Sequence, residues 1–183
     1  MIGPMNAPPP EILSSGPVEL RRWRSADAEL CLRLVTESLD HLRPWMPWAT
    51  SAYDLATAEA YLQGCEDGWA AGTAFNYLIW AGEPAGSAGL MARIDPGGLE
   101  IGYWVHRAHT GRGVATAAAA ALTQAALALP GIDHVEIHHD QLNLASERVP
   151  AKLGYTHVDT RPETRFDRAA ADSGISKVWR ITR

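Results

Sequence analysis

Residues 99–116 read LEIGYWVHRAHTGRGVAT, and this segment decides the predicted fold because it joins a strand pattern to a helix pattern through two glycines. Apolar residues dominate positions 99–106, which predicts a strand. The run 111–129 holds nine Ala between positions 115 and 128 and stops at Pro130, which predicts a helix. The first N–H groups of a helix lack partners, and the helix dipole adds positive charge there. Because Gly111 and Gly113 have no Cβ, an anion can approach these amides, so the junction is predicted to bind a phosphate-like group.

The two glycines have a second interpretation, which is a tight turn between strand and helix without any ligand. The segment also differs from two common nucleotide-binding motifs. No Gly-Lys-Ser/Thr follows, as a Walker A loop requires, and the GxGxxG spacing with its downstream acidic residue is missing. A P-loop and a dinucleotide-binding turn are therefore excluded.

The rest of the chain alternates strand and helix patterns around this segment. Strands are predicted over 18–23, 75–81, 85–93, 134–139, 154–159 and 175–182, and helices over 25–40, 54–71 and 143–152. The segment 41–50 is predicted to be irregular, and the polar segment 161–174 to be a mobile loop. This order predicts a mixed α/β fold in one domain, residues 17–183, preceded by a flexible, Pro-rich leader over residues 1–16.

Composition excludes several other classes of protein. The chain has 183 residues, 46% of them hydrophobic, which indicates a globular domain. Its net charge of −5 argues against attachment to nucleic acid or to a membrane through bulk charge. Two cysteines are too few for a disulfide framework and no signal peptide is recognisable, so a cytoplasmic location is expected. His134 and His138 could share a strand face but lack a third ligand, so no metal site is predicted.

Four motifs resemble the GNAT superfamily of acetyltransferases, and within it the RimJ/RimL-like enzymes that acetylate protein N-termini or other amines. They are EIGYWV, HTGRGVAT, NLASERVPAKLGY and the upstream LRPWMPWA, and the resemblance spans residues 18–182. It implies a central mixed, mostly antiparallel sheet with helices on both faces, splayed between the strands 99–106 and 134–139. It also implies acetyl-CoA, or another acyl-CoA, as the donor and a primary amine as the acceptor, which attacks the thioester directly.

The resemblance further implies which residues hold the donor. The pyrophosphate-binding turn corresponds to Thr110, Gly111, Arg112, Gly113, Val114 and Ala115. The strand backbone at Trp104 and Val105 corresponds to the part that pairs with the pantetheine amides, and the Val105 amide would stabilise the developing oxyanion. Asn143 would contact the pantetheine arm, although Asn is also a favoured helix N-cap. The Arg112 side chain would face either the phosphates or solvent.

Two residues are candidates for the chemistry. Glu100 matches the strand glutamate of the family and would act as general base for the attacking amine, directly or through water; an exposed strand position is the alternative. Ser146 would protonate the departing thiolate or hold a water that does so. Many GNAT enzymes use a Tyr four residues beyond this Ser, but this chain has Pro150 there.

The acceptor itself is left open by the sequence. Trp45 and Trp48 lie among prolines and would form an apolar wall of the acceptor pocket, whereas most other tryptophans are expected in the core. The acceptor could be a protein N-terminus or a small molecule such as an aminoglycoside. The acyl group could be succinyl, and a non-catalytic acyl-CoA sensor is an alternative of a different class. A homodimer is compatible with the subfamily.

Overall fold

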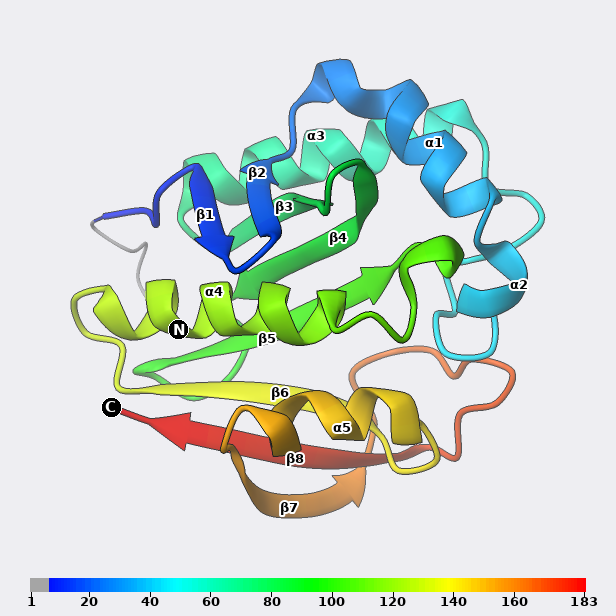
Figure 1. The fold of residues 1–183 in the computed structure, drawn as a ribbon. Coiled ribbons are helices and arrows are strands. Elements are labelled where there is room, and N and C mark those ends of the chain that lie inside the picture. Colours follow the sequence, from blue (N-terminus) through cyan, green and yellow to red (C-terminus); the bar gives the residue numbers. More distant parts are fainter. Residues whose placement is uncertain (1–6) are drawn as a thin grey trace.

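The computed structural model describes residues 7–183, and its centre is a sheet of eight strands in the order β1-β2-β3-β4-β5-β6-β8-β7 (Figure 1). All neighbouring strands are antiparallel except β5 and β6, which are parallel. The strands are β1 (Ile12–Ser15), β2 (Val18–Arg22), β3 (Ala74–Trp80), β4 (Pro84–Met91), β5 (Gly98–Val105), β6 (His134–Asp140), β7 (Thr156–Pro162) and β8 (Ile175–Thr182). The predicted mixed, mostly antiparallel sheet is confirmed.

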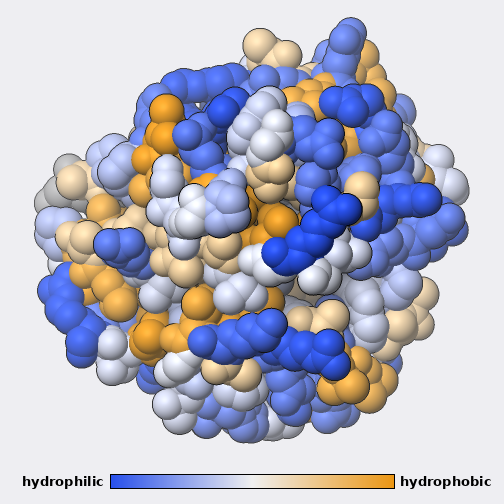
Figure 2. Space-filling model, in the orientation of Figure 1, coloured by the Kyte–Doolittle hydropathy of each residue, from blue (hydrophilic) through white to orange (hydrophobic). Residues whose placement is uncertain are grey.

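Helices cover the two faces of this sheet, as predicted, but the described residues form five α-helices rather than four, because the segment 25–40, predicted as one helix, is interrupted at Glu37 and Ser38. They are α1 (Ala28–Thr36), α2 (Leu39–Leu42), α3 (Leu55–Ala71), α4 (Val114–Ala128) and α5 (Leu144–Lys152). Figure 1 shows α4 and α5 in front of the sheet and α3 behind it. On the front face, small groups of apolar side chains lie among hydrophilic ones, as expected for a layer of helices that meets water (Figure 2).

Each face has its own core. On one face the central side chains of α4, with Leu122 and several buried alanines, pack on sheet residues such as Leu20, Phe75 and Ile101. On the other face α1 and α3 pack around Trp23. Alanine side chains are short, so α4 lies close to the strands beneath it, which explains the Ala-rich composition of this helix.

The sheet is splayed between β5 and β6. The two strands pair only from Gly98–His134 to Ile101–Ile137, although β5 continues to Val105 and β6 to Asp140. Beyond Ile101, β5 keeps its partner β4 while β6 keeps its partner β8. One edge of the last part of β5 is therefore left without a strand partner, which is the opening predicted at this place.

The predicted leader over residues 1–16 is too long. Ile12–Ser15 form β1, which pairs with β2 through Leu13 and Leu20. Glu11 also accepts hydrogen bonds from Arg22 and Arg24, at 2.8 and 2.6 Å. The free edge of β2 needs backbone partners, and this short strand supplies them despite its Pro-rich surroundings. Residues 1–6, which include Pro4, lie outside the described part of the chain.

Candidate active site

A cavity of about 620 Å³ reaches through the splay between β5 and β6. On the α5 side it is lined by Tyr103, Asn143 and Ser146. On the opposite side it is lined by residues of α1, of α3 and of the segment 45–53, by Glu100 and Trp104 of β5, and by the loop between β7 and β8. A molecule bound in the slot could thus meet a second molecule that enters from the other face of the sheet.

The backbone of β5 presents alternate residues to this slot. The N–H of His106 donates to the Ala85 carbonyl of β4 at 2.7 Å, and a Cβ on Gly86 would lie only 2.2 Å from the Trp104 carbonyl oxygen. Main-chain groups of successive strand residues point to opposite edges, so Trp104 faces β4, while Tyr103 and Val105 face the slot. The prediction that the Trp104 backbone pairs with pantetheine therefore does not fit this register, and Trp104 contributes its indole ring to the cavity instead.

The predicted anion-binding turn follows β5 and ends at α4. Gly111 and Gly113 have φ of +73° and +76°, a conformation that favours glycine, and a Cβ on either would meet nothing within 4 Å. Gly113 is the N-cap of α4 and has no side chain to cap the first N–H groups of the helix. Thr110 and Arg112 are exposed, whereas Val114 is buried and Ala115 half-buried. The turn is therefore exposed to solvent from Thr110 to Gly113, with open space beside both glycines.

Asn143 and Ser146 occupy the first turn of α5. The Asn143 side-chain oxygen accepts a hydrogen bond from the Ser146 N–H at 3.1 Å, so Asn143 is the N-cap of this helix. Both residues also line the cavity, so the capping role does not remove Asn143 from the slot. The Ser146 hydroxyl lies 2.9 Å from the Tyr103 hydroxyl, a contact that sequence reasoning missed because the two residues lie on separate elements.

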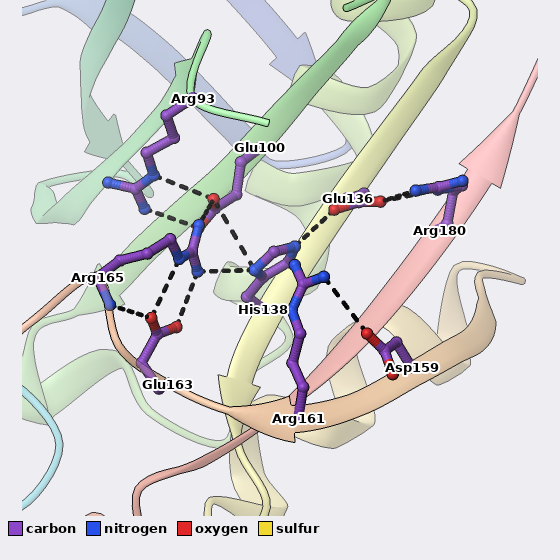
Figure 3. A network of polar contacts seen from close by, with 9 residues as sticks. All are labelled: Arg93, Glu100, Glu136, His138, Asp159, Arg161, Glu163, Arg165 and Arg180. Carbon is purple, nitrogen blue, oxygen red and sulfur yellow. Dashed lines mark hydrogen bonds and ion pairs between the residues drawn. The ribbon is translucent and has the colours of Figure 1, made fainter. Parts of the chain in front are cut away.

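Glu100 lies at the centre of a charged cluster (Figure 3). Its side chain is only 4% exposed, and Arg93 donates to both of its oxygens, at 2.7 and 3.0 Å. Arg165, from the loop after β7, donates a third hydrogen bond at 2.8 Å, and the His138 ring lies 3.9 Å away. Burial raises the pKa of Glu100, but Arg93, with added effects of His138 and Arg165, outweighs burial and holds this pKa below its usual value. The exposed position considered for Glu100 is thus ruled out, and the carboxylate binds protons weakly.

The same cluster includes His138 and extends to β8. Nδ1 of His138 lies 2.8 Å from the Arg165 guanidinium, and Nε2 of His138 lies 2.6 Å from the Glu136 carboxylate. Glu136 also accepts from Arg180, and Glu163 accepts from Arg165 at 2.8 Å. Arg165 therefore anchors the start of the loop after β7 at the cavity, whereas the segment 161–174 was predicted to be a mobile loop. No local pattern signals the contacts of Arg165 with Glu100 and His138, because these partners lie 65 and 27 positions away in the sequence.

Several aromatic rings also line the cavity. Trp45 and Trp48 both line the cavity, and their role as a wall of the acceptor pocket stays a prediction. The Trp48 ring lies 6.1 Å from the Trp104 ring and 6.0 Å from the Tyr53 ring, measured between centroids. Trp23 is fully buried in the core, as expected for the other tryptophans.

Comparison with protein families decides the family. The sequence profile described as an acetyltransferase (GNAT) domain matches residues 18–156, which is most of the chain. The chain belongs to the GNAT acetyltransferase family. Membership confirms the predicted activity class, an N-acetyltransferase that uses acetyl-CoA as co-substrate. None of the curated protein sequences matches the chain significantly.

Solved structures share the GNAT fold at low sequence identity. The RimL ribosomal L7/L12 α-N-protein acetyltransferase in complex with coenzyme A is 22% identical, with a TM-score of 0.84 over 94% of this chain and 98% of that one. Mycobacterium smegmatis RimJ in complex with CoA-disulfide is 22% identical, with a TM-score of 0.79 over 93% and 85%. The microcin C7 self-immunity acetyltransferase MccE in complex with acetyl-CoA and AMP is 17% identical, with a TM-score of 0.81 over 91% and 92%.

Among residues 7–183, no group of three or more His, Cys, Asp and Glu side chains is arranged to hold a metal ion. Within the same residues, no helix has both the length and the apolar character needed to cross a bilayer.

Proposed function

We propose that this protein transfers the acetyl group of acetyl-CoA to the α-amine of an acceptor, by direct attack of the amine on the thioester. One observation supports this more than any other: a single cavity joins the slot beside β5 to an aromatic and charged chamber on the other face of the sheet. The donor and the acceptor can then approach from opposite faces, which brings the two reacting groups together without a covalent enzyme intermediate.

The donor side uses mostly backbone groups. The open amides from Gly111 to Ala115 would bind the pyrophosphate, and Arg112 is close enough in sequence to add its charge. The slot-facing backbone of Tyr103 and Val105 would pair with the pantetheine arm, with Asn143 on the opposite side. We assign the Val105 N–H to the oxygen that becomes negative during attack, because a fixed amide there needs no reorganisation.

The acceptor amine is expected to have a low pKa. The Glu and His side chains that line the cavity are already engaged: Glu100, Glu163 and His138 in the charged cluster, and His139 with the Asp140 carbonyl and the Trp179 indole. None of these Glu and His side chains in the described part of the chain is thus free to act as a strong base. An α-amine has a pKa of about 7.7–8.0 and is largely neutral at pH 8, whereas a lysine amine, at about 10.4, stays protonated.

The role of Glu100 then differs from the one predicted, in which it deprotonates the amine before attack. Once the neutral amine has bonded to the thioester carbon, its nitrogen is positively charged and carries two protons, and one of them is now acidic enough for a weakly basic carboxylate to accept it; the other stays on the amide product. We propose that Glu100 accepts this proton, directly or through water, after attack rather than before it. The C–S bond then breaks, the electron pair leaves with sulfur, and Ser146 donates a hydrogen bond to the departing thiolate.

The donor, the acceptor and catalysis itself can be tested in one thiol-release assay. Acetyl-CoA is offered with ribosomal-protein N-terminal peptides, with the same peptides blocked at the α-amine but carrying a free lysine, and with aminoglycosides; succinyl-CoA replaces acetyl-CoA in a parallel series. Release only with free α-amines is the expected result. Release with blocked peptides or aminoglycosides would contradict the α-amine proposal, and tight CoA binding without release for any amine would indicate a sensor.

A further inference from the structure

We infer that Tyr103 is a positioning residue that orients the Ser146 hydroxyl toward the departing thiolate. This inference rests on the proposed function, because it requires Ser146 to contact the sulfur of CoA. Tyr103 lies on β5 just beyond Ile101, the last residue of β5 that pairs with β6, and its ring lines the slot. No other side-chain hydroxyl or carboxylate in the described residues is within hydrogen-bond distance of the Ser146 hydroxyl.

The geometry allows two arrangements of the two hydroxyl protons. In the first, Tyr103 donates to Oγ of Ser146 at 2.9 Å, and the single Ser146 proton is free to point into the cavity. In the second, Ser146 donates to Tyr103, and Tyr103 donates to the Ser146 carbonyl, which lies farther away at 3.3 Å. Only the first arrangement leaves a donor for the thiolate. A thiolate in the slot is the strongest acceptor present, so it favours the first arrangement.

Tyr103 can hold this arrangement over the whole working pH range. Burial raises the pKa of its hydroxyl to about 12, so Tyr103 stays protonated and always has a hydrogen to donate. The tyrosine itself is too weak an acid to hand its proton to a thiolate, since a thiol has a pKa of about 8.5. The contribution of Tyr103 is therefore to orient the Ser146 hydroxyl. Ser146 also lies at the start of α5, where the partial positive charge of the helix favours a nearby thiolate.

The chain offers a matched control for this hydroxyl. Tyr155 is also buried, and its hydroxyl lies 2.6 Å from the Thr123 hydroxyl of α4. The Tyr155–Thr123 pair lies outside the lining of the cavity. Tyr103→Phe and Tyr155→Phe thus each remove one hydroxyl from a part-buried Tyr–hydroxyl pair, but only the first pair faces the slot.

The test compares four variants: Tyr103→Phe, Ser146→Ala, the double variant and Tyr155→Phe. Tyr103→Phe is expected to lower kcat about tenfold, uniformly from pH 6 to pH 9, and to change the KM for acetyl-CoA less than about twofold. The double variant should be no slower than Ser146→Ala, because Tyr103 acts through Ser146. Tyr155→Phe should keep kcat while losing about as much thermal stability as Tyr103→Phe.

The outcomes separate this inference from the proposed function. Normal turnover of Tyr103→Phe beside a slow Ser146→Ala overturns the inference and leaves the proposed function intact. Additive losses in the double variant, or equal losses of kcat in Tyr103→Phe and Tyr155→Phe, also overturn it. Normal turnover of Ser146→Ala removes the assigned role of Ser146 and the inference with it, and a wild-type enzyme that releases no thiol removes the proposed function itself.

Discussion

Glu100 and Glu136 form a natural pair for asking what a buried carboxylate does in this protein. They are direct partners in the β5–β6 register, each is 3% exposed, and each binds arginine. Only Glu100 lines the cavity. A difference between their variants therefore reports on chemistry, because the loss of a buried charge is common to both.

We expect Glu100→Gln to lower kcat at pH 7–8 by about tenfold to a hundredfold, because the amide cannot accept the proton of the attacking nitrogen. The KM for acetyl-CoA should change little, since donor binding uses other groups. Glu136→Gln should keep kcat within about threefold, although both variants should lose on the order of 1–3 kcal/mol of folding free energy. Steady-state kinetics with urea unfolding checks both quantities, and an equal loss of turnover in the two variants would assign Glu100 a structural role only.

Glu136 should also control stability in acid. Burial raises its pKa, but the hydrogen bonds from His138 and Arg180 outweigh burial and lower this pKa to about 2. Because the folded pKa lies below the unfolded value of about 4.3, the stabilisation is complete above pH 5 and disappears as the pH falls toward 2. We expect the stability advantage of wild type over Glu136→Gln, about 1–3 kcal/mol at pH 6, to shrink steadily in urea unfolding between pH 5 and pH 2. A constant difference across this range would show that Glu136 is not the group that titrates.

At the scale of the element, α4 packs on the sheet, and its N-terminus is proposed to bind the pyrophosphate of acetyl-CoA; both expectations come from one stretch of sequence. The start and end of α4 were predicted within about three residues, because alanine propensity, the glycines and Pro130 are local signals. The role of its N-terminus depends on a backbone conformation that can be tested by substitution. Gly113 precedes the helix with φ of +76°, and Gly131 follows it with φ of +79°.

Gly113→Ala should weaken acetyl-CoA binding, whereas Gly131→Ala should not. Both substitutions place a Cβ in a left-handed conformation with open space around it, so both should cost about 1 kcal/mol of stability. Only the methyl group at position 113 would stand where the pyrophosphate is predicted to lie, and we expect a rise in the KM for acetyl-CoA of about tenfold. Titration of CoA by calorimetry measures this directly; equal affinity of the two variants would place the phosphates elsewhere.

At the scale of the whole molecule, local sequence signals predicted most of the helices and strands, whereas the edge strand β1 and the contacts of Glu100 depend on long-range contacts that no local signal gives. The strands and helices followed from hydrophobic periodicity, and the splay followed from the GNAT resemblance. The strand Ile12–Ser15 was missed because neighbouring prolines resemble a leader, and it forms only because β2 has a free edge. Arg93 and Arg165 were missed as partners of Glu100 because nothing near Arg165 in the sequence indicates a carboxylate 65 positions away. The Trp104 backbone was predicted to face the pantetheine slot, but the hydrogen-bonding register between β4 and β5 decides which residues of β5 face β4 and which face the slot, and the sequence does not give this register.

The splay leads to a prediction about the molecule as a whole. β1–β5 and β6–β8 are joined within the sheet by the four residue pairs from Gly98–His134 to Ile101–Ile137, and a pantetheine arm in the slot would extend that connection. Binding of CoA should therefore raise the melting temperature, because a ligand held by the folded state alone stabilises it. It should also protect those backbone amides that face the slot and no others on this part of β5.

Amide hydrogen exchange followed by NMR can resolve this residue by residue. In the free protein, the amides of Tyr103 and Val105 face the slot and should exchange quickly, whereas the Trp104 amide faces β4 and should exchange slowly. Saturating CoA should slow Tyr103 and Val105 by about tenfold or more and leave Trp104 nearly unchanged, because two of these three amides gain a partner. Protection of Trp104 alone would reverse the register argument, and unchanged exchange at all three amides with CoA bound would place the pantetheine arm outside the slot.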